Sequence, residues 1–190
     1  MAERYFELEQ NLYIPGLWYL DEPTDLNGQE VDDIWQFAAG RVVDIREPLR
    51  VPLYRPGNPL DFSTTCAGVT PIVHPKLASV FSELAPGDVQ LSPVQVEGQP
   101  EPYFLVNAMR LVKCIDDSAC KRVLYWTPED GRPEKTGTYR NVVGLRIDKS
   151  KVGGAKVFRT WGWSIALIVS EDLKEALERT GATGMKFTEV

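Results

Sequence analysis

The hydrophobic residues of this chain recur with a helical period in three stretches. In residues 74–87, "HPKLASVFSELAPG", four apolar residues form one stripe behind Pro75, which suits the first position of a helix, and a Pro-Gly pair ends it. Residues 31–38 carry a similar stripe that includes Trp35 and is soon followed by a glycine. Residues 171–179 repeat the pattern after a serine that can cap the helix. The pattern therefore predicts three helices.

Alternating and continuous apolar stretches predict strands in most of the remaining chain. The segments are "RYFELEQ", "RVVDI", "LRVPLY", "DVQLSPVQVEG", "PYFLVNAMRLVKCID", "KRVLYW", "YRNVVGLRID", "KVFRTW", "WSIALIV" and "GMKFTEV". Pro93 shifts the alternation of the fourth segment and predicts a bulge or kink at a sheet edge. "PYFLVNAMRLVKCID" is apolar on both faces through Val106, and "WSIALIV" is so throughout, which is typical of strands covered on two sides.

These elements predict an α+β fold, in which about three helices pack on a mostly antiparallel, β-rich sheet. The length of 190 residues is sufficient for a single domain, 1–190. The stretch 56–75 is rich in Pro, Gly, Ser and Thr. It could link an N-terminal subdomain, 1–56, to a β-rich C-terminal part, 75–190, or it could equally form one long surface loop.

The net charge of −6 is distributed unevenly along the chain. Residues 1–33 contain nine Asp and Glu and one Arg, which gives −8 there and +2 for the remainder. Residues 110–159 contain twelve Lys and Arg against six Asp and Glu. The overall acidity disfavours general binding of nucleic acid, whereas a segment of one sign can steer a basic protein partner.

The sequence also indicates where the protein resides. No stretch approaches the roughly 18 unbroken apolar residues that are needed to cross a bilayer. The N-terminal "MAERYFELEQ" carries three glutamates where an export signal has a basic and then an apolar run. We expect a protein of the cytoplasm that does not contact a membrane.

Cysteine and histidine give little support for a metal site or a disulfide framework. The cysteines are Cys66, Cys114 and Cys120, an odd number without a CxxC motif, and His74 is the single histidine. We therefore expect neither a metal nor another cofactor. Cys66 precedes His74 by eight residues, so a small enzyme that uses this pair remains an alternative. Such an enzyme needs the thiolate and the imidazole within hydrogen-bond reach, and a lone histidine before a helix is more often a cap.

Several aromatic residues lie within or beside the acidic segment. An apolar anchor inside a rim of one charge sign favours a protein interface. Trp35 belongs to the predicted core stripe, and ordinary packing remains the alternative for the other aromatics. The predicted contact residues of such an interface are Trp18, Tyr19, Asp21, Glu22, Asp25, Glu30, Asp32 and Asp33.

Seven short segments carry a resemblance to a known family through their order along the chain. They are "DIWQFAAGR", "PLDF", "TPIVHPKLASVFSEL", "VQLSPVQV", "PYFLVNAMRLVKCID", "SIALIVSEDLKEAL" and "TGMKF". Together they cover most of residues 30–190. In these segments the chain resembles immunity protein family eleven, from bacterial contact-dependent and polymorphic toxin systems, which was formerly a domain of unknown function.

The resemblance implies a cytoplasmic bacterial protein that binds and neutralises the toxin encoded beside it, as used in competition between bacteria. It implies neither catalysis nor a cofactor, and it assigns no binding residues. A toxin that cleaves nucleic acid, with a basic active site, is a partner that an acidic surface would attract. Besides the small enzyme with Cys66 and His74, a self-associating structural or regulatory module remains open, in which edge strands are buried in a homo-oligomer.

Overall fold

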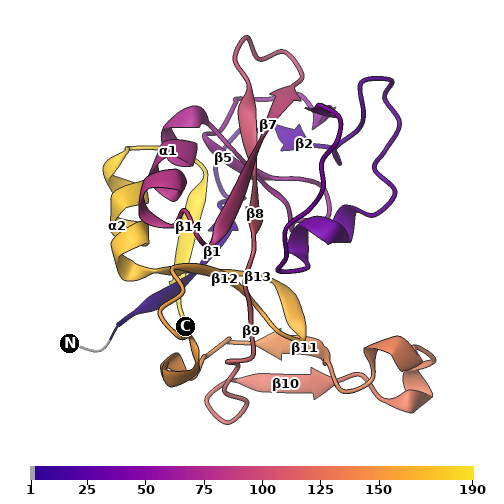
Figure 1. Ribbon diagram of the computed structural model, residues 1–190, viewed down its shortest axis with the longest axis vertical. Coiled ribbons are helices and arrows are strands. Elements are labelled where there is room, and N and C mark those ends of the chain that lie inside the picture. The colour runs from indigo at the N-terminus through magenta and orange to yellow at the C-terminus, as the bar shows by residue number, and fades with distance from the viewer. Residues whose placement is uncertain (1–2) are drawn as a thin grey trace.

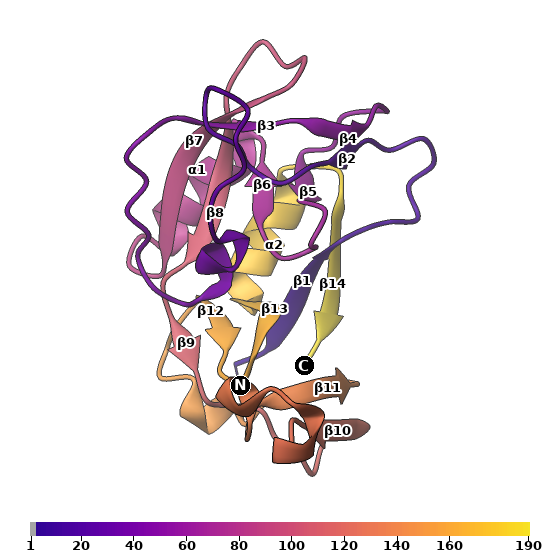
Figure 2. The ribbon, with the colours of Figure 1, turned by 90° about the vertical axis from the view of Figure 1, so that its right-hand side faces the viewer.

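Two five-stranded sheets form the body of the protein in the computed structural model, which describes residues 3–190 (Figures 1 and 2). The first sheet has the order β14-β1-β13-β12-β9, with β1 Tyr5–Gln10, β9 Leu111–Val112, β12 Val157–Thr160, β13 Trp163–Ser170 and β14 Met185–Glu189. The second has the order β3-β7-β8-β6-β5, with β3 Leu49–Val51, β5 Phe62–Thr64, β6 Pro71–Val73, β7 Val89–Val96 and β8 Tyr103–Ala108. Two smaller ribbons pair β2 Tyr19–Leu20 with β4 Leu53–Arg55, and β10 Arg122–Tyr125 with β11 Tyr139–Val143.

Two α-helices, α1 Pro75–Leu84 and α2 Glu171–Arg179, pack against each other. The helix α1 lies against β7 and β8 of the second sheet, and α2 lies against β13 and β1 of the first. Both helices were predicted, and α1 begins at its proline as expected. Their apolar stripes enter the same core, which also takes side chains from strands of both sheets. No helix within residues 3–190 has the length and apolar character that a bilayer crossing requires.

The strand β13 lies in the centre of the first sheet, as its apolar character on both faces predicts. The strand β1 pairs antiparallel with β13 on one side and with β14 on the other. Consequently β14 runs parallel to β13, and α2 makes the crossover between them above β1. The first 55 residues contribute β1 to the first sheet and β3 to the second.

The apolar stretch 102–116, predicted as one long strand, is two strands in different sheets. The strand β8 ends at Ala108, and Leu111 begins β9, which pairs parallel with β12. At this crossing Arg110 forms an ion pair of 2.6 Å with Asp88, a largely buried residue that precedes β7. The other oxygen of that carboxylate accepts main-chain N–H groups of residues 156 and 157, where β12 begins. The polar cluster therefore joins the second sheet to the first at the point where the chain changes sheets.

The predicted fold, with about three helices packed on one sheet, is wrong because the strands are divided among several sheets and only two α-helices form within residues 3–190. The third predicted helix is a short 3₁₀ helix, η1, Ile34–Ala38. It has about three residues per turn, so an apolar stripe of period 3.6 does not face one side of it. As a result Trp35, which was predicted in the core, is 52% exposed, whereas Phe37 is buried.

Two strand predictions also fail. Residues 41–45 form no strand, and the side chain of Gln90 instead bonds both the N–H and the carbonyl of Val43. The strand β7 was predicted at an edge with a bulge, but it lies between β3 and β8 and keeps its register with β8 past Pro93. Because β3 pairs with β7 only from Val94 onward, Pro93 stands just outside that ladder and removes no donor from it.

The strands β10 and β11 project from the body as a ribbon (Figures 1 and 2). We refer to residues 121–143 as the arm; its tip contains two 3₁₀ turns, η2 Pro128–Asp130 and η3 Pro133–Lys135. The hydroxyls of Tyr125 and Tyr139 both donate to the carboxylate of Asp117, which precedes the arm. The main-chain N–H of Tyr139 also donates to the carbonyl of Gly162, so the first residue of β11 is fixed to the turn before β13.

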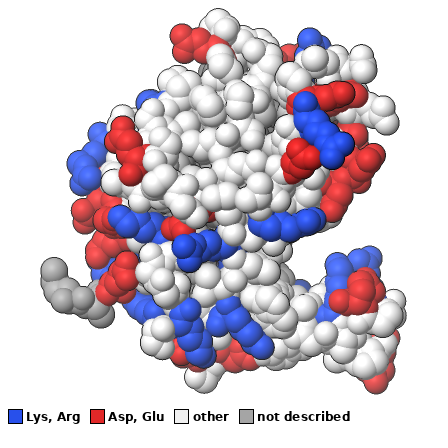
Figure 3. All heavy atoms as spheres, viewed as in Figure 1, with Lys and Arg blue, Asp and Glu red and all other residues white. Residues whose placement is uncertain are grey.

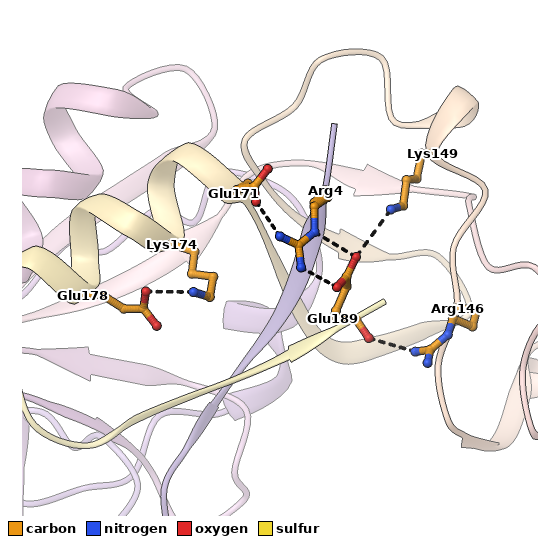
Figure 4. A network of polar contacts seen from close by, with 7 residues as sticks. All are labelled: Arg4, Arg146, Lys149, Glu171, Lys174, Glu178 and Glu189. Atoms are coloured by element: carbon orange, nitrogen blue, oxygen red, sulfur yellow. Dashed lines mark hydrogen bonds and ion pairs between the residues drawn. The ribbon is translucent and has the colours of Figure 1, made fainter. Parts of the chain in front are cut away.

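Ion pairs tie the ends of the first sheet together (Figure 4). The guanidinium of Arg4 pairs with Glu171 at the start of α2 and with Glu189 at the end of β14, at 2.7 and 2.6 Å. Lys149, in the 3₁₀ turn η4 Lys149–Lys151, lies 4.0 Å from Glu189, whose carbonyl accepts a bond from Arg146. All of these groups are substantially exposed, so the network fixes geometry more than it adds stability.

Candidate functional site

The acidic residues that were predicted to bind a partner lie on the loop between β2 and η1. Main-chain bonds in both directions between Thr24 and Arg50 attach this loop to β3. The carboxylate of Asp25 accepts the main-chain N–H groups of Gln29 and Asn27, at 2.9 and 2.8 Å. These bonds close a tight turn and lower the pKa of Asp25, with the bond from Gln29 as the largest cause. The loop is therefore shaped by its own acidic side chains.

A cavity of about 480 Å³ opens beside this loop. The residues that line it include six acids and one base: Asp25, Glu30, Asp32, Asp33, Asp44 and Glu47, with Arg46. We refer to it as the acidic hollow. The buried side chains of Phe37, Val43 and Leu49 also border it, and Arg46 is paired with Asp44 at 2.7 Å. Acidic residues gather on the right of the upper part of the molecule in Figure 3. An acidic rim above an apolar floor suits a basic protein partner better than a small apolar ligand.

Neither of the two predicted aromatic residues lines the acidic hollow. Trp18 is 1% exposed; its indole N–H donates to the hydroxyl of Ser63 at 2.7 Å, and its ring packs against Tyr103. Tyr19 is half-buried, and the guanidinium of Arg55 lies 4.2 Å from its ring centroid. Trp18 is thus a core residue that positions the loop.

Asp21 and Glu22 also lie apart from the acidic hollow. The carboxylate of Glu22 accepts the main-chain N–H of Ala67 at 2.6 Å, which ties the loop to the segment between β5 and β6. Cys66, beside these two acids, donates to the carbonyl of Leu20. The structure therefore brings four of the eight predicted residues together in one cavity: Asp25, Glu30, Asp32 and Asp33.

Sequence reasoning missed two acids of the hollow, Asp44 and Glu47. Asp44 stands in "RVVDI", which was assigned to a strand, and Glu47 follows that segment. The acidic segment was counted only to residue 33. Both acids lie within fifteen positions of residue 33, and this closeness was the sequence signal that could have identified them. They reach the hollow because residues 41–48 form an irregular loop that passes beside η1.

A comparison with protein-family models matches residues 3–190 to the immunity protein family (Imm11). The chain belongs to the Imm11 family. The match covers both large sheets, the acidic hollow and the arm, and it confirms the resemblance seen in the sequence. A comparison with curated proteins returned no match.

In this Imm11 protein, Cys66 and His74 are engaged in separate contacts. The ring nitrogen Nδ1 of His74 accepts the main-chain N–H of Lys76 at 3.2 Å and so caps α1. Burial, followed by the charges of Asp21 and Glu22, raises the pKa of the Cys66 thiol. A thiol with a raised pKa is a poor nucleophile at neutral pH, so this geometry does not support the Cys–His pair. Within residues 3–190 no three His, Cys, Asp or Glu side chains are grouped as metal ligands.

Proposed function

We propose that this protein is an immunity protein that binds and neutralises a cognate bacterial toxin by protein–protein association. The observation that carries the proposal is the Imm11 match over residues 3–190. The match extends over almost the whole chain and includes every element that shapes the acidic hollow. The proposed place of action is the cytoplasm, where a toxin delivered by a neighbouring cell would reach its target.

The acidic hollow supports a mechanism in which electrostatic attraction guides the toxin to the immunity protein. Carboxylates of one sign around a cavity raise the rate of encounter with a basic surface, such as the active site of a nuclease. A nanomolar complex requires a binding free energy of about 12 kcal/mol, and specific interfaces typically bury about 1,600 Å². The acidic hollow would therefore be one part of a wider interface that covers the toxin.

Co-expression with the product of the neighbouring gene tests the proposed function. A bacterium that expresses the toxin alone should stop growing, and one that expresses both proteins should grow and yield a complex that co-purifies. An unrelated toxin serves as the control, because specific immunity should not protect against it. Continued growth arrest in the presence of abundant folded immunity protein would refute the proposal.

A further inference from the structure

Four of the five tryptophans of this protein line one cavity outside the acidic hollow. Trp35 comes from η1, Trp126 from the arm, and Trp161 and Trp163 from the turn before β13 and from its first residue. Trp35 and Trp161 are 52% and 37% exposed, respectively. Exposed tryptophans are the residues most enriched in the energetic centres of protein interfaces. The convergence of four tryptophans from three separate segments, with Trp35 and Trp161 exposed, indicates a binding surface.

The cavity lies between the arm and the body and has a volume of about 540 Å³. We refer to it as the tryptophan cleft. In Figure 3 the surface is notched on the right, between the upper part of the molecule and the projecting arm. Two exposed aliphatic side chains, Leu111 and Ile165, also line it. A cleft of this size accommodates a few side chains of a partner.

The charges around the tryptophan cleft are positive. Lys135 and Arg140 line it, and no acid within residues 3–190 does. The cationic groups of Arg132, Lys135 and Arg140 all lie 5.3–5.9 Å from the ring centroid of Trp126. Arg140 pairs with a carboxylate of the arm, that of Asp130, at 2.7 Å. Three cations around one ring repel one another, and an anionic group from a partner would relieve that repulsion.

The acidic hollow lies beside the tryptophan cleft and limits the kinds of partner that the cleft can bind. The acidic hollow and the tryptophan cleft both border η1. Asp33, which lines the hollow, caps this helix by accepting the main-chain N–H of Trp35, which lines the cleft, at 2.9 Å. Stacked aromatics with cations also suit single-stranded nucleic acid. However, the six acids of the adjoining hollow and a net charge of −6 repel a phosphate backbone. An acidic protein segment is also repelled, but it carries fewer charges and can place its carboxylates at Lys135 and Arg140, whereas a phosphate backbone carries a charge at every nucleotide.

We propose that the tryptophan cleft is the docking site for an acidic segment of the toxin that carries apolar or aromatic side chains. This inference rests on the proposed function, which supplies the toxin as partner. The apolar side chains of the segment pack between Trp35, Trp126 and Trp161, and its carboxylates pair with Lys135 and Arg140. The toxin would thus present a basic patch to the acidic hollow and an acidic segment to the cleft beside it.

Binding of the neighbouring-gene toxin to full-length variants provides the first test. Trp161→Ala and Lys135→Glu should each weaken the complex at least about tenfold. Tyr54→Ala and Arg179→Glu change an aromatic residue that is 70% exposed and a cation that is 69% exposed, both outside the cleft, and should change affinity less than about twofold. If the wild type binds and all four variants bind equally well, the cleft proposal is refuted while the proposed function stands.

A second test decides the chemistry of the cleft without the toxin. The probes are a synthetic peptide of sequence Glu-Glu-Phe-Glu-Glu-Phe, the same peptide with lysine in place of glutamate, and oligothymidylate, each titrated by tryptophan fluorescence at low salt. The acidic peptide should bind the wild type and should lose binding to Trp161→Ala. Binding of the basic peptide or of oligothymidylate that is stronger than that of the acidic peptide and is lost in Trp161→Ala would overturn the proposal, as would self-association that is lost in Lys135→Glu. Failure of the toxin to bind, together with a positive peptide result, would refute the proposed function and the toxin as occupant of the cleft, while the preference of the cleft for an acidic, apolar segment would stand.

Discussion

The guanidinium of Arg159 donates a hydrogen bond to the main-chain carbonyl oxygen of Val69, and this bond joins the two large sheets. Arg159 lies in β12, and Val69 lies in the loop between β5 and β6. A second bond, of 2.9 Å, reaches the carbonyl of Ile165, where the register between β12 and β13 shifts. Arg159 is 1% exposed, and burial lowers its pKa to about 10. The buried charge is thus held by main-chain dipoles.

Substitutions of Arg159 should distinguish the stabilisation by these hydrogen bonds from the destabilisation caused by burying its charge. Arg159→Met removes the desolvated charge but leaves two carbonyl oxygens without a donor, for a net loss of about 1–3 kcal/mol in the free energy of unfolding. Arg159→Lys keeps the charge and loses the planar fork that reaches both acceptors, so it should be less stable than Arg159→Met. Urea unfolding of the three proteins gives the order. A lysine variant as stable as the wild type would contradict this account.

Close packing at Gly184 predicts a large effect of a single methyl group. Gly184 has a φ of +99°, and a Cβ atom there would lie 3.1 Å from the carbonyl carbon of Phe62 and closer still to its oxygen. Gly184→Ala should therefore lower the free energy of unfolding by about 2–4 kcal/mol. Gly181 is the matched control, because it has a φ of +66° and its added methyl group would meet no atom of a non-neighbouring residue within 4 Å. Gly181→Ala should cost only about 1–2 kcal/mol, and equal losses in the two variants would show that the clash at Gly184 is relieved.

The two α-helices and the central strand β13 were predictable because their signals are local. Pro75 begins α1, and Leu77 and Phe81 enter the core as the helical period requires. The division of residues 102–116 between two sheets was not predictable, since it depends on the contact between Arg110 and Asp88, which are distant in the sequence. The apolar pattern continues through the crossing and therefore indicated a single strand.

The candidate site was predictable from charge but not from aromatic pattern. The count of acids in residues 1–33 led to four residues of the acidic hollow. Trp35 was assigned to the core, but a 3₁₀ helix turned it outward. Trp18, a predicted contact residue for which ordinary packing was the alternative, is held inside by the contact with Ser63. The tryptophan cleft joins η1, the arm and β13, and only the tertiary structure brings these segments together.

The carboxyl group of Glu7 should make stability depend on pH. Burial, followed by the charge of Glu9, raises the pKa of Glu7 from 4.5 to about 7. Between these values the folded protein holds a proton that the unfolded chain has lost, so the free energy of unfolding should fall by about 2 kcal/mol as the pH rises from 4.5 to 7. Glu7→Gln should remove this decline, whereas Glu83→Gln, an exposed site on α1, should retain it. Urea unfolding at pH 5 and pH 8 measures the difference, and parallel declines in wild type and Glu7→Gln would assign it to other groups.

The hydrogen bonds to Asp117 should govern the order of the arm. Both Tyr125 and Tyr139 donate to this carboxylate, one from each strand of the ribbon. Asp117→Ala should increase hydrogen exchange of the main-chain amides in β10 and β11 by about tenfold while the exchange of α1 stays unchanged, because the arm opens separately from the body. Glu129→Ala, at the exposed tip of the arm, is the control. Exchange that rises equally throughout the protein would instead indicate global destabilisation.

Neutralising the acidic hollow should slow association with the toxin without loosening the formed complex to the same extent. The variant that combines Glu30→Gln, Asp32→Asn and Asp33→Asn removes three charges at exposed positions, and asparagine at 33 preserves the cap of η1. Its association rate should fall about tenfold or more at low salt and approach the wild-type rate at high salt, because screening removes the attraction from both proteins. The control combines Glu83→Gln, Glu101→Gln and Glu175→Gln, which removes the same net charge from exposed positions outside both the hollow and the cleft. If both triple variants associate equally fast in stopped-flow measurements, net charge alone guides the encounter and the acidic hollow has no specific part in it.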